Sequence, residues 1–193
     1  MTVTIKYNSQ LAESTISSYM KDWTEKNGNI TTATDKVYGQ FADATMGAGN
    51  QYSMGSSHQA DTGMILEGAL VYNFQQHVFY GTMESLELGE VFVPNEGGLG
   101  RHFELPQPQL KVSGLDVTST LGEAREGEVH KSVRGLQEGN PDSMLALLKT
   151  IGIDVDTQLK DMAIASQFEV MASDMPMIDT VGVVESSDML LAA

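Results

Sequence analysis

The chain has 193 residues, of which 11 are Lys or Arg and 26 are Asp or Glu, so its formal net charge is −15. This length predicts one domain that is large enough for a hydrophobic core, and the negative charge argues against binding to nucleic acid or to an anionic membrane surface. The sequence contains no cysteine, which excludes disulfides, thiolate zinc sites and iron–sulfur clusters.

The first elements are a strand, a helix and a long loop. Residues 3–7 alternate between apolar and polar side chains, which predicts a strand and does not fit a secretory signal peptide. Residues 9–27 predict a helix that is capped by Ser9 and ended by Gly28. Its apolar side chains have helical spacing: Ile16, Tyr19, Met20 and Trp23. Residues 29–49 have no period and predict a loop of a length that is usually functional in a compact domain.

The middle of the chain predicts strands and the later part predicts helices. Strands are expected at residues 64–74, 77–88 and 110–118, with a turn at 97–100. Helical spacing then begins at Val129 and ends at Gly139. A second helix opens after Asn140-Pro141 and stops at Gly152, and a third is expected from Asp156 to Ala163.

This order of elements predicts an α+β fold, with an antiparallel sheet covered by helices on one face. No apolar run reaches 18 residues, so no membrane insertion is expected. The 12 methionines fall mostly at core-like positions, which favours packing over a copper site.

Common catalytic motifs are absent. The sequence has no His-Glu-x-x-His zinc signature, no phosphate-binding P-loop and no Gly-x-Ser-x-Gly nucleophile elbow. The four histidines are scattered without the spacing of metal ligands: His58, His77, His102 and His130. The residues themselves therefore give no reason to expect an enzyme.

Tyr72 and His77 flank the junction of the two central strands. Gln75 and Gln76 do not favour the positive φ angles of a two-residue hairpin turn, so a wider loop is expected between them. A neighbouring imidazole can accept the proton of a phenol and raise its tyrosinate character, and tyrosinate is an axial ligand for haem iron. The alternative interpretation is an ordinary cross-strand contact between a Tyr and a His.

The last part of the chain, residues 171–193, is rich in Met, Ser, Asp and Val and ends in an apolar Leu-Leu-Ala-Ala. A frayed tail is the default interpretation of such a terminus. The apolar end after an acidic stretch also fits a C-terminal export signal.

Several segments together are similar to the secreted haem-acquisition hemophores of the HasA type. The similar segments lie along nearly the whole chain: residues 4–7, 19–23, 49–52, 67–72, 77–81, 125–136, 181–183 and 189–193. The resemblance implies one strongly curved antiparallel β-sheet with α-helices packed on one face and haem held between two loops. It implies Tyr72 as the axial iron ligand and His77 as the hydrogen-bond partner of its phenol.

The resemblance also implies residues that line or approach the haem: Val37, Tyr38, Tyr52, Arg125 and His130. Three departures from the family pattern accompany them, of which one is a shorter loop between Tyr72 and His77. Thr32 stands where many members have a second axial histidine, and neither it nor Thr31 is a plausible strong ligand for ferric haem. Arg134 and Gln137 occupy late-helix positions that are often aromatic or Met.

The implied function is capture of ferric haem b, held non-covalently, for iron acquisition. The implied organisation is a haem-binding domain at residues 1–170 and a type I secretion signal at 171–193. The expected protein is an extracellular monomer and not an enzyme; its partners would be an outer-membrane hemophore receptor, a type I ABC exporter and haemoglobin as a haem source. The alternatives are a type I-secreted hydrolase and an adhesive protein-binding module, and neither would change the spectrum of added hemin.

Overall fold

The computed structural model describes residues 2–42, 47–95 and 102–169 and has the α+β fold expected from the sequence. In this part of the chain one sheet has the strand order β2-β3-β4-β5-β8-β1-β9. Its strands are β1 (Thr4–Tyr7), β2 (Gln40–Phe41), β3 (Ala48–Gly55), β4 (Thr62–Asn73), β5 (Val78–Glu90), β8 (Gln107–Ser119) and β9 (Ala165–Gln167). Neighbouring strands are antiparallel, except that β9 runs parallel to β1 at the edge. A small separate sheet pairs β6 (Val93–Pro94) with β7 (Phe103–Glu104).

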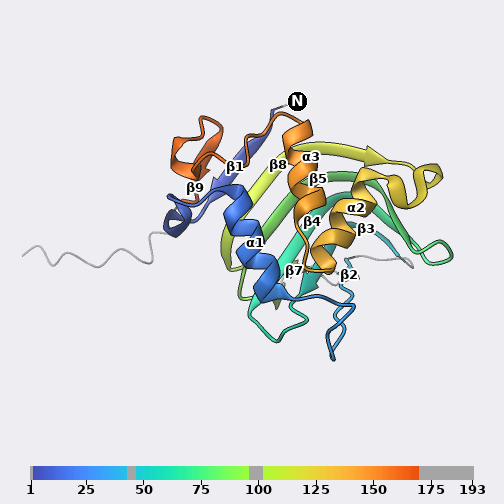
Figure 1. The fold of residues 1–193 in the computed structure, drawn as a ribbon. Helices are drawn as coiled ribbons and strands as arrows, with labels where there is room; N and C mark the ends of the chain where they lie inside the picture. The colour runs from blue at the N-terminus through green and yellow to red at the C-terminus, as the bar shows by residue number, and fades with distance from the viewer. Residues whose placement is uncertain (1, 43–46, 96–101, 170–193) are drawn as a thin grey trace, which may run out of the picture.

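Three α-helices lie on one face of the large sheet (Figure 1). They are α1 (Ile16–Asn27), α2 (Glu128–Gln137) and α3 (Asp142–Thr150). Each helix buries apolar side chains in one core cluster that joins helices and sheet, and α3 packs against α2. The six methionines among the described residues are all buried: Met20, Met54, Met64, Met83, Met144 and Met162. Their expected packing role is therefore confirmed.

Bulges bend the long strands β4 and β5. The register between them shifts between Glu67 and Leu70, where Gly68 has φ +139°, and Gly81 on the opposing strand has φ +105°. A Cβ at Gly81 would lie 2.1 Å from the carbonyl oxygen of Ala69. Only glycine permits this approach of the two backbones, and bulges of this kind increase the bend and twist of a sheet.

The strands and helices that border the site match the sequence-based expectations. The strands expected at 64–74, 77–88 and 110–118 are β4, β5 and β8, each slightly longer than expected, and the helix expected from Val129 is α2. The helix after Pro141 is α3, whose first backbone amide, that of Asp142, donates to Asn140 Oδ1 at 2.8 Å. The turn expected at 97–100 and the tail at 171–193 lie outside the described residues.

Two expectations about helices are wrong. The first helix begins at Ile16 and not near Ser9, because Thr15 and Ser18 form a capping box in which each side chain accepts from the other's backbone N–H. The helix expected from Asp156 to Ala163 is a single 3₁₀ turn, η3 (Leu159–Asp161), followed by β9. There the backbone N–H of Lys160, which would bond to the Asp156 carbonyl in an α-helix, donates instead to the Ala12 carbonyl, and the N–H of Leu159 donates to the Ser14 carbonyl.

Two strands beside the site, β2 and β3, do not follow from the sequence pattern. β3 begins inside the segment taken as a loop, and β2 lies wholly within it. Residues 48–55 contain Gly, Asn and Ser and lack alternation, and residues 51–54 are all buried. Pairing with β4 on one side and β2 on the other holds this segment in the sheet, since tertiary context overrides weak strand propensity.

Candidate functional site

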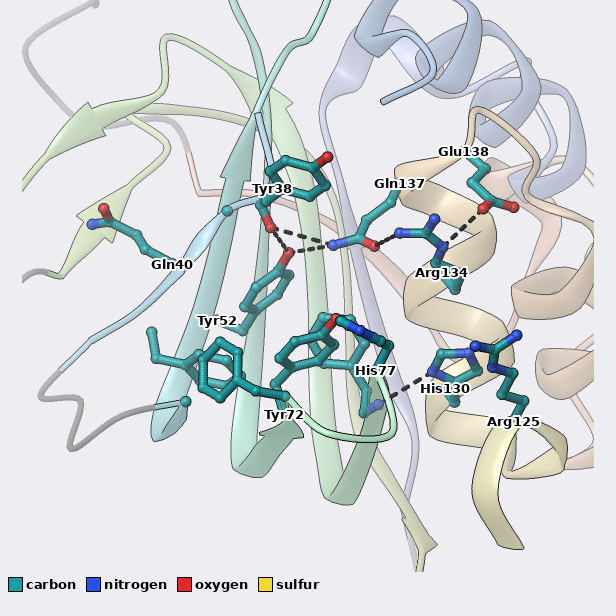
Figure 2. Close-up of a pocket in the computed structure, with 15 residues that line it drawn as sticks. Tyr38, Gln40, Tyr52, Tyr72, His77, Arg125, His130, Arg134, Gln137 and Glu138 are labelled. Atoms are coloured by element: carbon teal, nitrogen blue, oxygen red, sulfur yellow. Dashed lines mark hydrogen bonds and ion pairs between the residues drawn. The ribbon is translucent and has the colours of Figure 1, made fainter. Parts of the chain in front are cut away.

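A cavity of about 1000 Å³ lies between three parts of the fold: the segment around β2, the β4–β5 hairpin and the exposed side of α2 (Figure 2). The volume is at the upper end of the range of about 300–1,000 Å³ that is typical of small-molecule sites. Its lining residues are Tyr38, Gly39, Gln40, Phe41, Gly47, Tyr52, Tyr72, Phe74, His77, Phe79, Arg125, His130, Arg134, Gln137 and Glu138.

The β4–β5 hairpin places Tyr72 and His77 beside its connecting loop. Asn73 pairs with Val78, which leaves a four-residue loop at 74–77, wider than a tight turn as the sequence predicted. Asn73 Oδ1 accepts from two loop amides, those of residues 75 and 76, at 3.0 and 2.8 Å. His77 itself adopts the positive φ, +56°, that closes the loop. The loop therefore returns the chain to β5 with the His77 ring within reach of Tyr72.

The Tyr72 phenol contacts the His77 imidazole directly. Tyr72 Oη lies 3.2 Å from His77 Nδ1, and the two groups share a hydrogen bond. The Tyr72 ring is half-buried and packs against Phe79, its cross-strand partner, at a centroid distance of 4.7 Å. Phe74 meets the same ring edge-on at 5.1 Å. The phenol is thus fixed by aromatic contacts, while its oxygen stays at the cavity beside a proton acceptor.

A second tyrosine in the cavity has a different environment. Tyr52 on β3 is 2% exposed, and its hydroxyl donates to the carbonyl of Tyr38 and accepts from Gln137 Nε2 at 2.6 Å. Burial raises the pKa of Tyr52 well above its ordinary value, so the group remains a neutral phenol. The same Gln137 amide donates to the Tyr38 carbonyl at 3.3 Å. This network connects α2 to the segment that carries Tyr38.

His130 on α2 is a neutral imidazole. Its Nδ1 accepts the backbone N–H of Phe79 at 3.2 Å, so the proton of the neutral ring resides on Nε2. Burial lowers the pKa of His130, and the positive charges of Arg134 and Arg125 lower it further. The ring is therefore a fixed part of the wall and a link between helix and hairpin.

The charged groups of the cavity lie on the same side as the neutral His130 (Figure 2). Arg134 Nε forms an ion pair with Glu138 Oε1 at 2.8 Å, and Arg134 Nη1 donates to Gln137 Oε1 at 3.3 Å. His130, Arg134 and Glu138 are spaced four residues apart along α2, so they share one face of the helix (Figure 2). Arg125 is exposed in the preceding 3₁₀ segment, η2 (Leu121–Glu126).

The structure brings together most of the residues selected from the sequence. Six of them line the cavity: Tyr38, Tyr52, Tyr72, His77, Arg125 and His130. Thr32 and Val37 are not part of its lining. Thr32 is exposed and its backbone N–H donates to the Asn29 carbonyl at 3.2 Å, whereas Val37 packs against the core cluster.

Several lining residues were not selected from the sequence. Phe41 and Phe79 enter through strand pairing, because Phe41 faces Tyr52 and Phe79 faces Tyr72. The spacing of Arg134 and Glu138 from His130 on a helix was the available signal for those two positions. Phe74 and Gly47 meet at the cavity edge, where a Cβ on Gly47 would lie 2.6 Å from the Phe74 ring.

The arrangement suits a large flat ligand with an electrophilic metal and anionic substituents. Aromatic rings from β2, β3 and the hairpin form apolar walls, one phenol with a proton acceptor faces the cavity, and two guanidinium groups lie at its helical side. Haem has these properties, because ferric iron binds phenolate and the macrocycle carries two carboxylates.

Comparison with known proteins supports haem as the ligand of this cavity. The fold and the cavity define a haem-binding protein of the hemophore class. The chain belongs to the Heme-binding protein A (HasA) family, whose model matches residues 1–193. The hemophore HasA of Serratia marcescens is 26% identical over 187 residues, which cover 91% of this chain and 97% of that protein.

Solved structures of HasA from Yersinia share the fold. The holo hemophore HasA of Yersinia pestis is 40% identical, with a TM-score of 0.82 over 88% of this chain and 100% of that one. Its apo form gives the same identity and TM-score over 88% and 98%. A monomeric tyrosine-to-alanine mutant of HasA from Yersinia pseudotuberculosis is 39% identical, with a TM-score of 0.82 over 88% and 100%. Among the described residues, no helix is long and apolar enough to cross a membrane.

Proposed function

We propose that this protein captures ferric haem in the cavity through the Tyr72 phenolate, with His77 as the hydrogen-bond partner of the ligand oxygen. The observation that carries the proposal is the 3.2 Å contact between Tyr72 Oη and His77 Nδ1 at the cavity wall. A phenol must lose its proton to bind iron strongly, and the neighbouring imidazole can accept that proton. Tyr52 also lines the cavity, but its buried hydroxyl donates to the carbonyl of Tyr38 and stays protonated, so it does not serve as the ligand in this proposal.

The walls of the cavity fit the body of the macrocycle. Phe41, Phe79 and Tyr52 form a connected aromatic cluster, with centroid distances of 5.1 to 6.4 Å. Two rings of the lining, Phe74 and Tyr38, are 58% and 56% exposed. Burial of these rings by a bound macrocycle would add apolar contact area.

Tyr72 is proposed as the one protein ligand of the iron. Thr32, at the place of the second axial histidine in many relatives, is exposed and not part of the cavity lining. Its hydroxyl is also a poor ligand for ferric iron. The sixth coordination position would then be empty, or filled by water or by a side chain not yet identified.

The wider role follows the family. We propose that the protein is secreted as a monomer, acts outside the cell as a haem carrier rather than an enzyme, and delivers haem to an outer-membrane hemophore receptor. Haemoglobin is a proposed haem source. Residues 1–170 would form the haem-binding domain, and residues 171–193 would be the signal for a type I ABC exporter. The HasA structure from Yersinia pestis is a holo hemophore and the HasA mutant from Yersinia pseudotuberculosis is a monomer, which supports the haem-carrier and monomer parts of this proposal.

Titration of the purified chain with ferric hemin tests the proposal. The expected result is a red-brown complex with a shifted Soret band that saturates at one hemin per chain. If the protein were a secreted hydrolase or an adhesive module, the spectrum would remain that of free hemin. That result would reject the hemophore assignment.

A further inference from the structure

The positive charges of the cavity are all arginines. The chain has three arginines and eight lysines. Arg125 and Arg134 line the cavity, and no lysine is part of its lining. The net charge of the protein is −15, yet two guanidinium groups line this cavity. A guanidinium group can pair with a carboxylate through two parallel hydrogen bonds.

The two guanidinium groups have unused hydrogen-bonding capacity. Arg134 uses Nε for Glu138 and Nη1 for Gln137, and a guanidinium has five N–H groups in all. Arg125 forms no ion pair and donates no hydrogen bond within the described part of the chain. Both side chains can therefore accept an additional anionic partner without breaking a buried contact.

The Arg134–Glu138 pair is easily exchanged for another carboxylate. Its two side chains are 37% and 39% exposed, and half-exposed ion pairs four residues apart on a helix contribute little to stability. Gln137 fixes the other end of the guanidinium and is itself held by Tyr52. The group is thus oriented at the cavity by Gln137, while its charge is shared with a carboxylate that a ligand can replace.

We infer that Arg134 and Arg125 bind the two carboxylate side chains of haem, an inference that rests on the proposed function. Arg134 selects for a ligand with free carboxylates, and Glu138 competes with that ligand for the guanidinium. The carboxylates would be oriented toward α2, on the side of the cavity that carries His130.

Hemin and hemin dimethyl ester, titrated in the same detergent-containing buffer, test the inference. Both have the same iron and macrocycle, and the ester lacks the negative charges. The ratio of the two Kd values therefore reports carboxylate recognition and is insensitive to a general loss of fold. We expect the native chain to prefer hemin, and Arg134→Gln and Arg125→Gln each to reduce this preference by about fivefold, as for partly exposed charge-assisted hydrogen bonds.

Lys131→Gln is the matched control, because it removes the same charge from α2 outside the cavity, where Lys131 pairs with Glu128 at 2.8 Å. Its preference is expected to equal that of the native chain, whereas Glu138→Gln is expected to increase the preference. If both arginine variants keep the native ratio, the inference is wrong while hemin binding through Tyr72 stands. If neither porphyrin binds the native chain, both the proposed function and the inference fail.

Discussion

The backbone N–H of Phe79 donates to Nδ1 of His130 at 3.2 Å, which joins the hairpin strand to α2 across the inner end of the cavity. Phe79 faces Tyr72 across the hairpin, so the helix also holds the strand partner of the proposed ligand. The bond requires a neutral imidazole, because a protonated His130 has no acceptor at Nδ1. The shape of this wall is thus linked to the protonation of one histidine.

His130→Asn should flatten the pH dependence of folding stability. The pKa of His130 is lowered in the folded state, so between about pH 6.5 and the lower folded pKa the unfolded chain binds more protons. The free energy of unfolding therefore has its full value above about pH 6.5 and decreases as the pH falls toward the folded pKa of His130. Asn keeps a side-chain acceptor for Phe79 and cannot titrate. Urea unfolding at several pH values measures the slope, and an unchanged slope in the variant would contradict the assignment.

His77→Ala should weaken haem binding less than the loss of Tyr72 does, and more strongly at low pH. In the proposed native pair, which is 3.2 Å apart, the imidazole would take up the proton that the phenol releases on binding iron. Without it the proton goes to solvent, so affinity falls as the proton concentration rises. Soret titrations between about pH 5 and 8, where imidazoles titrate, measure this effect. Affinity of the variant that did not change with pH would exclude the proton-accepting role.

Thr32→Ala should leave haem binding unchanged. The Thr32 hydroxyl lies 3.4 Å from the Asn29 carbonyl oxygen, and the side chain is exposed and absent from the cavity lining. Hemin affinity and the visible spectrum of the ferric complex should both match those of the native protein. A shift in the spectrum on this substitution would mean that Thr32 or its loop contributes to the iron environment.

Gly81→Ala should destabilise the fold strongly. Gly81 has φ +105°, and an added Cβ would lie 2.1 Å from the Ala69 carbonyl oxygen, so torsional strain and backbone overlap combine to cost about 3 kcal/mol or more. Gly152→Ala is the matched control, with φ +92° and no atom within 4 Å of the added Cβ. It should cost only about 1 kcal/mol, from torsional strain alone. Equal unfolding free energies for the two variants would show that the strand approach at Gly81 can relax.

The contact between Tyr72 and His77 could be predicted because it depends on local chain geometry. The two residues are five apart across one hairpin, and strand patterning placed both at its end. The contacts of Tyr52 with Gln137 and of Phe79 with His130 span 85 and 51 residues. They depend on how α2 packs on the sheet, and single-sequence periodicity does not encode that packing.

The same distinction separates the elements that were expected from those that were not. β4 and β5 have strong alternation, and Gly28 ended α1 where the sequence placed its end. The sequences of β3 and β9 lack the alternation that predicts a strand. Pairing with β4 and β1 holds these segments in the sheet. The loss of the expected third helix has the same cause, since its backbone donors are used by the N-terminal segment.

Tyr72→Phe tests the central claim most directly, because it removes one oxygen and keeps the ring that packs on Phe79 and Phe74. Tyr80→Phe is the matched control, since Tyr80 is on the same hairpin, pairs with Val71 and is not part of the cavity lining. Hemin titration followed at the Soret band should show native affinity for Tyr80→Phe and loss or gross weakening of binding for Tyr72→Phe. Native affinity and an unchanged Soret spectrum in Tyr72→Phe would contradict the assignment of Tyr72 as the iron ligand.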